Sequence, residues 1–128
     1  MRWLLDTNVL IDAFAGESTA LAALQKARSD SAEWIGFSSM TCLEIFGYSG
    51  LNKEDEEGLR NLIAGFAEVA ISAEVIEQAI HIRRATKIEV ADAIIAATAI
   101  VKGAEVITRN VDDFKRVPSL VVRDTAGV

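Results

Sequence analysis

Four acidic positions stand where polar side chains are least expected in this 128-residue sequence. Asp6 follows an apolar run near the N-terminus, Glu44 interrupts an apolar segment, and Asp92 begins the most apolar stretch of the chain. The fourth position is an acidic pair that ends at Asp113, just after another apolar run. Carboxylates that meet in one cleft repel one another, which costs stability unless a cation neutralises them. Because Mg²⁺ and Mn²⁺ favour oxygen ligands, these residues indicate a divalent metal site.

Each position also has a purely structural explanation. Asp6 opens a polar turn, and Asp is favoured at helix N-caps because its short side chain accepts from an unpaired first-turn amide. Glu44 has Thr41 three residues before it, which matches a capping box. Asp92 suits the positive end of a helix dipole, and Asp113 suits a turn cap. Taken singly, each carboxylate is open to both interpretations.

The elements that position these residues follow from the hydrophobic pattern. Apolar runs bounded by turn residues predict strands at 3–5, 34–37, 69–71, 105–108 and 120–123. Helical spacing predicts helices at 9–14, 17–28 with an end near Ser29-Asp30, 40–48 and 93–101, and after Asn52 and Ser72. Strands that alternate with helices predict an α/β fold with a mostly parallel sheet and helices on both faces. The carboxyl ends of parallel strands share one edge, so the distant carboxylates are expected to converge there.

The composition fits one soluble domain over residues 1–128. Hydrophobic residues make up 51% of the sequence, which is enough for a core at this length. No apolar run approaches the roughly 18 residues of a membrane span, and the N-terminus has no secretory pattern. Cys42 is the single cysteine, so no internal disulfide is expected. These features predict a cytoplasmic protein that does not associate with membranes.

The charge pattern constrains how the protein could hold a nucleic acid. A formal net charge of −6 argues against binding through bulk positive charge. It does not exclude a nucleic-acid enzyme, because a bound metal reverses the sign of an acidic site. A lone histidine, His81, leaves oxygen atoms as the expected ligands. A basic rim around the acidic centre would hold phosphates, and its candidate residues are Arg83, Arg84, Lys87, Arg109 and Lys115.

Four segments, in this order along the chain, together resemble the PIN-domain ribonucleases. They are Leu-Leu-Asp6-Thr7-Asn8-Val-Leu-Ile-Asp12, Ser39-Met-Thr-Cys-Leu-Glu44-Ile-Phe-Gly47, Val90-Ala-Asp92-Ala-Ile-Ile-Ala-Ala-Thr98-Ala and Val106-Ile-Thr108-Arg109-Asn110-Val-Asp-Asp113-Phe114. The length is similar to that of the toxin half of bacterial and archaeal VapBC toxin-antitoxin pairs. The resemblance implies a three-layer α/β/α sandwich with a parallel sheet. It also implies a Mg²⁺- or Mn²⁺-dependent endoribonuclease.

The resemblance assigns roles to the acidic positions. Asp6 and Asp92 would bind one metal ion, with Glu44 binding it directly or through water. The fourth catalytic position has two candidates. Many members of the family have Asp directly after Thr-Arg, where this chain has Asn110. Others use the acid immediately before the Phe, which is Asp113 here.

The resemblance also implies supporting residues and partners. Thr7, Asn8 and Thr108 match polar positions of the family, and side chains of this kind hold metal-binding carboxylates in place. Arg83, Arg84, Lys87 and Arg109 become candidates for binding the RNA substrate. The implied protein partners are an antitoxin, which would place a basic side chain into the carboxylate cluster, and a second copy of the chain in a homodimer.

Three other functions fit parts of the sequence. A phosphoacceptor receiver domain would need a phosphorylatable Asp in mid-chain and a late lysine, whereas this chain has Glu44 and Thr108-Arg109. A non-catalytic PIN-like binding module is favoured only by Asn110. A DNA flap or exonuclease would need DNA-gripping elements for which a chain of 128 residues has little room. The metal-dependent ribonuclease accounts for more of the sequence than any of them.

Overall fold

The structure, a computed structural model, describes residues 1–29 and 32–128. Within these ranges the strands form a single sheet, and every neighbouring pair of strands is parallel. The strands are β1 (Arg2–Leu5), β2 (Trp34–Ser38), β3 (Ala67–Val69), β4 (Glu105–Thr108) and β5 (Val122–Asp124). Their order across the sheet is β3-β2-β1-β4-β5. The predicted parallel α/β fold is therefore confirmed.

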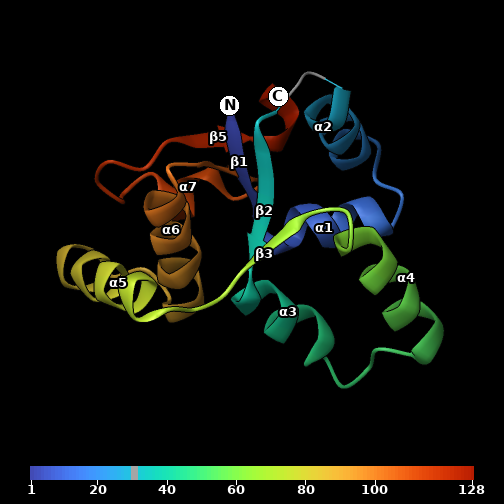
Figure 1. The fold of residues 1–128 in the computed structure, drawn as a ribbon, viewed down its shortest axis with the longest axis horizontal. Helices are drawn as coiled ribbons and strands as arrows, with labels where there is room; N and C mark the ends of the chain where they lie inside the picture. Colours follow the sequence, from blue (N-terminus) through green and yellow to red (C-terminus); the bar gives the residue numbers. More distant parts are fainter. Residues whose placement is uncertain (30–31) are drawn as a thin grey trace.

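Helices cover both faces of the sheet (Figure 1). The helices are α1 (Thr7–Phe14), α2 (Ser18–Ser29), α3 (Ser39–Phe46), α4 (Lys53–Ile63), α5 (Ala73–Ala85), α6 (Val90–Lys102) and α7 (Val111–Phe114), with a 3-10 turn at Thr125–Gly127. Helices α1, α2 and α4 lie on one side, and α5 and α6 lie on the other, while α3 sits beyond the end of β2 (Figure 1). This arrangement is the expected three-layer α/β/α sandwich.

The sheet has a hydrophobic core on each of its two faces, which explains why its central strands do not alternate between apolar and polar residues. Leu4 of β1 packs into the core beneath α5 and α6, whereas Trp3 and Leu5 pack into the core beneath α1 and α2. On β4, likewise, Val106 packs into the core beneath α5 and α6, and Ile107 packs into the core beneath α1 and α2. Successive side chains of a strand point to opposite faces, so a sheet that is buried on both faces needs apolar residues at every position.

The strand order creates a switch point between β1 and β4. The chain moves outward from β1 through β2 to β3, and then returns to the other side of β1 as β4. In open parallel sheets the crevice beside such a switch point is where ligands bind. Helix α6 precedes β4 and is buried from Ala93 to Ala99, where small side chains allow close packing on the sheet. Its N-terminus, with Asp92 in the first turn, therefore lies toward the carboxyl edge of the sheet.

Several predicted boundaries differ from those observed. Strand β3 begins two residues earlier than predicted, because the pairing with β2 starts at Ala67 and ends at Val69. Strand β5 begins and ends later than predicted, because its register with β4 pairs Val106 with Val122 and Thr108 with Asp124. The expected helix end at Asp30 lies outside the described residues. These differences arise because strand limits depend on the neighbouring strand as well as on local hydrophobicity.

The capping-box explanation of Glu44 is wrong. Ser38 is the N-cap of α3, and its side chain accepts a hydrogen bond from the backbone N–H of Met40 at 3.0 Å. Thr41 lies inside the helix and is fully buried. Glu44 is therefore not explained by a cap at the start of its helix.

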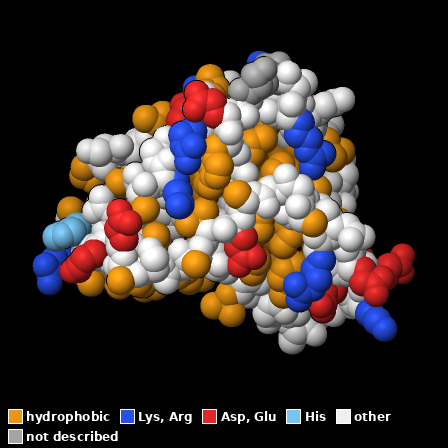
Figure 2. Space-filling model, viewed as in Figure 1, with side chains coloured by type: hydrophobic (Ala, Val, Ile, Leu, Met, Phe, Trp, Pro, Cys, Tyr) orange, Lys and Arg blue, Asp and Glu red, His pale blue; other side chains and the backbone are white. Residues whose placement is uncertain are grey.

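The face shown in Figure 2 has no single broad basic area. No helix within the described residues is both long enough and apolar enough to cross a bilayer. Lys and Arg side chains are scattered over the face shown in Figure 2, with acidic and hydrophobic side chains between them. This distribution agrees with the net charge of −6. Any nucleic acid bound to this face would therefore contact a few individual Lys or Arg side chains.

Candidate active site

Asp6 lies where β1 meets α1, and both of its carboxylate oxygens are engaged. One oxygen accepts from the backbone N–H of Thr7 at 2.8 Å, which makes Asp6 the N-cap of α1. The other accepts from Asn8 Nδ2 at 3.1 Å and from Thr108 Oγ1 at 2.8 Å. The residue is only 5% exposed. Asp6 is thus a cap and also the centre of a polar cluster, and an ionised carboxylate with three bonds still has acceptor capacity.

The turn after β4 is tied to α1 by a second group of contacts. The backbone N–H of Asn110 donates to Thr108 Oγ1 at 2.9 Å, and that of Arg109 donates to Asn8 Oδ1 at 3.4 Å. The guanidinium of Arg109 also meets both carboxylate oxygens of Asp12, at 3.0 and 2.8 Å. The sequence-based prediction gave Asp12 no role. Its signal is the spacing from Asn8, because residues four apart share one helix face.

Glu44 is held by the hydroxyl group of Thr7, which also contacts the hydroxyl of Thr41. Thr7 Oγ1 donates to Glu44 Oε1 at 2.7 Å, and the hydroxyls of Thr7 and Thr41 lie 2.9 Å apart. Glu44 is exposed, whereas Thr41 is fully buried. Through Thr7, helix α3 is connected to the same turn that presents Asp6. Thr41 was not among the predicted site residues, although its i, i+3 spacing from Glu44 places both on one side of α3.

Asp92 has the clearest electrostatic sign of a carboxylate cluster. Its pKa is raised to about 6, first by burial and then by the negative charge of Asp6. The charges of Asp113, Glu44 and Glu89 also contribute to the rise in this pKa. A carboxylate near other carboxylates is harder to ionise, because like charges repel. The fold has therefore brought Asp92 near the other predicted acidic residues.

The pKa of Asp6 responds to the same neighbours. Burial raises this pKa, while hydrogen bonds from Thr108 and Thr7 act against the rise. The charges of Glu44 and Asp113 raise it as well. Asp113 thus acts on Asp6 as well as on Asp92, whereas Asn110 carries no charge. Between the two candidates for the fourth position, the electrostatics favour Asp113.

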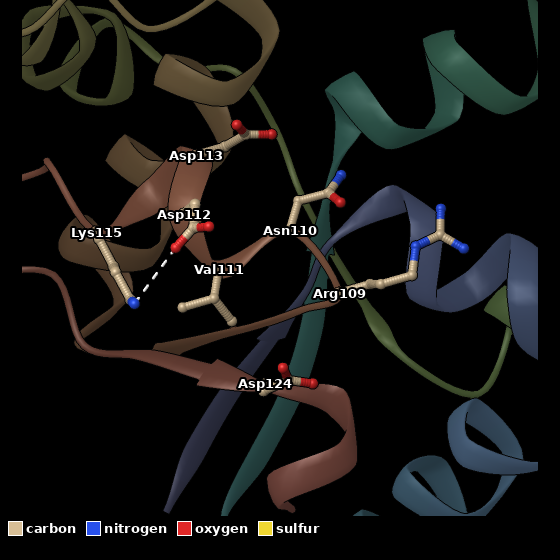
Figure 3. Close-up of a pocket in the computed structure, with 7 residues that line it drawn as sticks. All are labelled: Arg109, Asn110, Val111, Asp112, Asp113, Lys115 and Asp124. Carbon is tan, nitrogen blue, oxygen red and sulfur yellow. Dashed lines mark ion pairs between the residues drawn. The ribbon is translucent and has the colours of Figure 1, made fainter.

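Among the residues that the structure describes, no ion pair neutralises the charge of these carboxylates. In residues 1–29 and 32–128, no ion pair involves Asp6, Glu44, Asp92 or Asp113. Figure 3 shows Asp113 on α7 pointing away from the Asp112 and Lys115 side chains, which pair with each other at 3.3 Å. The cluster defined by Asp6, Glu44, Asp92 and Asp113 is called the acidic cluster below. Its charge favours a bound cation.

The donor chemistry of the acidic cluster fits Mg²⁺ or Mn²⁺, with water completing the coordination. Among the described residues, no three His, Cys, Asp or Glu side chains lie close enough to hold one ion by themselves. Mg²⁺ is usually bound through one or two carboxylates and keeps several waters. Asp6, at the end of β1, and Asp92, in the first turn of α6, could supply two such carboxylates. The residues therefore suit a hydrated ion better than a cage made only of protein.

The expected basic residues lie at two places near this edge. Arg83, at the end of α5, donates to the backbone carbonyl of Ile88 at 2.8 Å and so braces the connection to α6. Arg84, in the last turn of α5, and Lys87, in the connection that leads into the helix carrying Asp92, are both exposed. Arg109 lies on the turn after β4, beside Asn110 (Figure 3). Its pairing with Asp12 leaves other guanidinium N–H groups free to donate.

The raised pKa of Asp92 predicts how the stability of the metal-free protein depends on pH. The pKa rises from about 3.9 in the unfolded chain to about 6 in the fold. Between these values the folded state binds more protons, so stability should fall as pH rises through this window. At pH 7 the cost should be about 1 kcal/mol, after allowance for solvent screening at this half-buried position.

Urea unfolding in EDTA measures this effect when Asp92→Asn is compared with the wild type. The variant should be more stable by about 1 kcal/mol at about pH 7, and the advantage should shrink towards about pH 4. A stability advantage that does not change with pH would contradict the conclusion that the ionised Asp92 destabilises the fold. A variant that is less stable than the wild type near neutral pH would contradict it as well.

A doubly wound parallel sheet with an acidic cluster at its switch point defines an α/β protein with a candidate metal-dependent active site. The chain belongs to the PIN domain family, whose model matches residues 3–120. This finding confirms the family resemblance of the four motifs, and it leaves the receiver-domain alternative without support. No curated protein matches the sequence at a significant level.

Solved structures of similar fold include several toxin-antitoxin assemblies. A toxin-antitoxin complex from Klebsiella pneumoniae matches with 32% identity over 98% of each chain and a TM-score of 0.78. FitAcB from Neisseria gonorrhoeae matches with 26% identity over 98% of this chain and 99% of that chain, with a TM-score of 0.76. VapBC2 from Rickettsia felis, bound to a promoter DNA fragment, has 23% identity and a TM-score of 0.85, covering 97% and 98% of the two chains. At that identity, the last match is evidence for the fold alone.

Proposed function

We propose that this chain is a Mg²⁺- or Mn²⁺-dependent endoribonuclease and the toxin component of a type II toxin-antitoxin system in the cytoplasm. The observation that carries the enzymatic part is the acidic cluster, in which the pKa of Asp92 is raised to about 6 and no ion pair neutralises the charge within the described residues. The 32% identity to a chain of the Klebsiella pneumoniae toxin-antitoxin complex supports the biological role.

Asp6 and Asp92 are the proposed metal-binding residues, and Glu44 binds directly or through water. When bound, the ion would stabilise negative charge on the reacting phosphate and make water more acidic. Asn8 and Thr108 hold Asp6 by hydrogen bonds, and Thr7 holds both Asp6 and Glu44. Such supporting contacts fix the orientation of the ligands and are nearly as important as ligation itself.

The proposed reaction is attack of water on an RNA phosphodiester. Asp113 is exposed, and its charge acts on both Asp6 and Asp92, which supports a role for it as the group that would accept a proton from the attacking water. The backbone N–H of Asn110 donates a hydrogen bond to Thr108 Oγ1, and this bond helps to fix the turn that leads to Asp113. The P–O3′ bond would break and the departing 3′ oxygen would take a proton from solvent water, so that the cleavage would leave a 5′-phosphate and a 3′-hydroxyl.

Individual Lys and Arg side chains would hold the RNA, because the overall charge of the protein is negative. Arg83, Arg84 and Lys87 lie at or beyond the end of α5, close in sequence to Asp92. Arg109 pairs with Asp12 of α1, a helix on the other side of the sheet from α5, and this pairing fixes the direction of its side chain (Figure 1). Together these residues would contact phosphates on both sides of the acidic cluster.

The protein partners are also proposals. A cognate VapB-like antitoxin would bring a basic side chain to the acidic cluster, which no ion pair neutralises within the described part of the chain. A homodimer would cover apolar surface on α5. Ile76 and Ile80 are one helical turn apart there, and they are 40% and 38% exposed.

The function is tested by incubating the purified protein with a mixture of labelled RNAs and Mg²⁺. We expect internal cleavage of a subset of RNAs, with fragments that carry 5′-phosphates and 3′-hydroxyls. Ligation-based sequencing and phosphatase sensitivity identify these ends. Cyclic phosphate ends, which arise from attack by the RNA 2′-hydroxyl, would contradict the proposed reaction. The absence of any cleavage with either Mg²⁺ or Mn²⁺ would contradict the function itself.

A further inference from the structure

Thr41 is a fully buried polar residue on α3 that the proposed reaction does not use. Its hydroxyl lies 2.9 Å from that of Thr7, which in turn lies 2.7 Å from Glu44 Oε1. Thr7 is itself 92% buried, since its exposed fraction is 8%. The three oxygens form a chain that starts in the core of the protein and ends at the acidic cluster.

The direction of the hydrogen bonds in this chain follows from counting protons. An ionised carboxylate only accepts hydrogen bonds, so Thr7 must donate its single hydroxyl proton to Glu44. Thr7 then has no proton left for Thr41, and Thr41 must be the donor between the two hydroxyls. Each bond in such a chain polarises the next and strengthens it. The Thr41 hydroxyl therefore favours the Thr7 orientation that holds Glu44.

We propose that Thr41 is a positioning residue for the metal site, which acts through Thr7 to fix the carboxylate of Glu44. The inference rests on the proposed function. Thr41 lies too deep to touch a metal or a substrate, because no part of it is exposed. Its role is to supply one hydrogen bond that determines where the Glu44 oxygen points. Glu44 is on the exposed side of α3, where its long side chain would otherwise sample several rotamers.

The test is calorimetric titration of metal-free protein with Mn²⁺, comparing wild type, Thr41→Val and Thr41→Ser. Valine keeps the shape of threonine without the hydroxyl, and serine keeps the hydroxyl without the methyl. We expect Thr41→Val to weaken Mn²⁺ binding about tenfold, and Thr41→Ser to restore most of the affinity. Thr98→Val is the matched control, because Thr98 is equally buried but donates within α6 to Ile94 O at 2.7 Å.

A double-mutant cycle with Glu44→Gln separates positioning from a general loss of stability. If Thr41 acts through Glu44, the effect of Thr41→Val on Mn²⁺ affinity should largely disappear when Glu44 is already glutamine. Additive effects, or wild-type Mn²⁺ affinity in Thr41→Val, would overturn the inference while leaving the proposed function intact. Failure of the wild type to bind Mn²⁺ would instead overturn the proposed function, and the inference with it. If Thr41→Val does not fold, Thr7→Val breaks the same chain and should show the same dependence on Glu44.

Discussion

Replacing Asp92 with asparagine is expected to reduce RNA cleavage about a thousandfold without unfolding the protein. Asparagine has nearly the same shape but lacks the charge that would bind a cation. Burial, and after it the charges of the other carboxylates, raise the pKa of Asp92 to about 6, so removing the charge of Asp92 relieves both desolvation and repulsion. The variant should thus be inactive and yet more stable in EDTA near neutral pH. The measurements are kcat/KM on a labelled RNA and thermal unfolding of the same samples.

The matched control for this substitution is Asp112→Asn. Asp112 has a side chain that is 94% exposed, and it pairs with Lys115 outside the acidic cluster. Its replacement should leave cleavage within about twofold of wild type, because surface ion pairs contribute little. The account would be contradicted if Asp92→Asn cleaved RNA as fast as Asp112→Asn, or if both variants lost activity equally.

Removal of divalent metal should have an equally large effect. We expect EDTA to abolish RNA cleavage, and excess Mg²⁺ or Mn²⁺ to restore it fully. The same ions should stabilise the fold, because they bind the folded state and lower the repulsion among Asp6, Glu44 and Asp92. Binding at 100 times the dissociation constant adds about 2.7 kcal/mol of stability. Thermal unfolding with and without Mn²⁺ measures this gain.

The control for the metal effect is the Asp6→Asn variant in the same buffers. It should show a much smaller rise in Tm with Mn²⁺, since it lacks one of the two proposed main ligands. Added NaCl at equal ionic strength separates a specific site from general screening of the negative charge. Full activity in EDTA, or an equal rise in Tm for Asp6→Asn and wild type, would refute a metal site at Asp6.

Much of the fold could be predicted because its signals are local. The apolar strands and the polar turns after them place Asp6 and Thr108 at the same edge of a parallel sheet. The structure links the two at 2.8 Å, although they are 102 residues apart in sequence. The sequence left Asp6 open as a helix cap or a site residue. In the structure it is the N-cap of α1 and also lies within the acidic cluster.

The contacts that depend on packing could not be predicted. The Thr7–Thr41 contact and the Asp12–Arg109 pair join residues 34 and 97 positions apart. Nothing in the local pattern of either segment identifies the partner. The predicted limits of β3 were wrong for a related reason. The pairing of β3 with β2 ends at Val69, although Ile71 is also apolar. Helix spacing indicates only which residues share a side with a site residue, as Thr41 does with Glu44 on α3 and Asp12 with Asn8 on α1, and it does not identify the partner on the other segment.

In the proposed site, acidic side chains from distant parts of the chain share one divalent ion. Anomalous diffraction from crystals grown with Mn²⁺ tests it most directly, with Asp92→Asn crystals measured in the same way. The account predicts one strong peak between the carboxylates of Asp6 and Asp92 in the wild type, and its loss in the variant. A wild-type map without a peak there, or with Mn²⁺ bound only elsewhere on the surface, would contradict it.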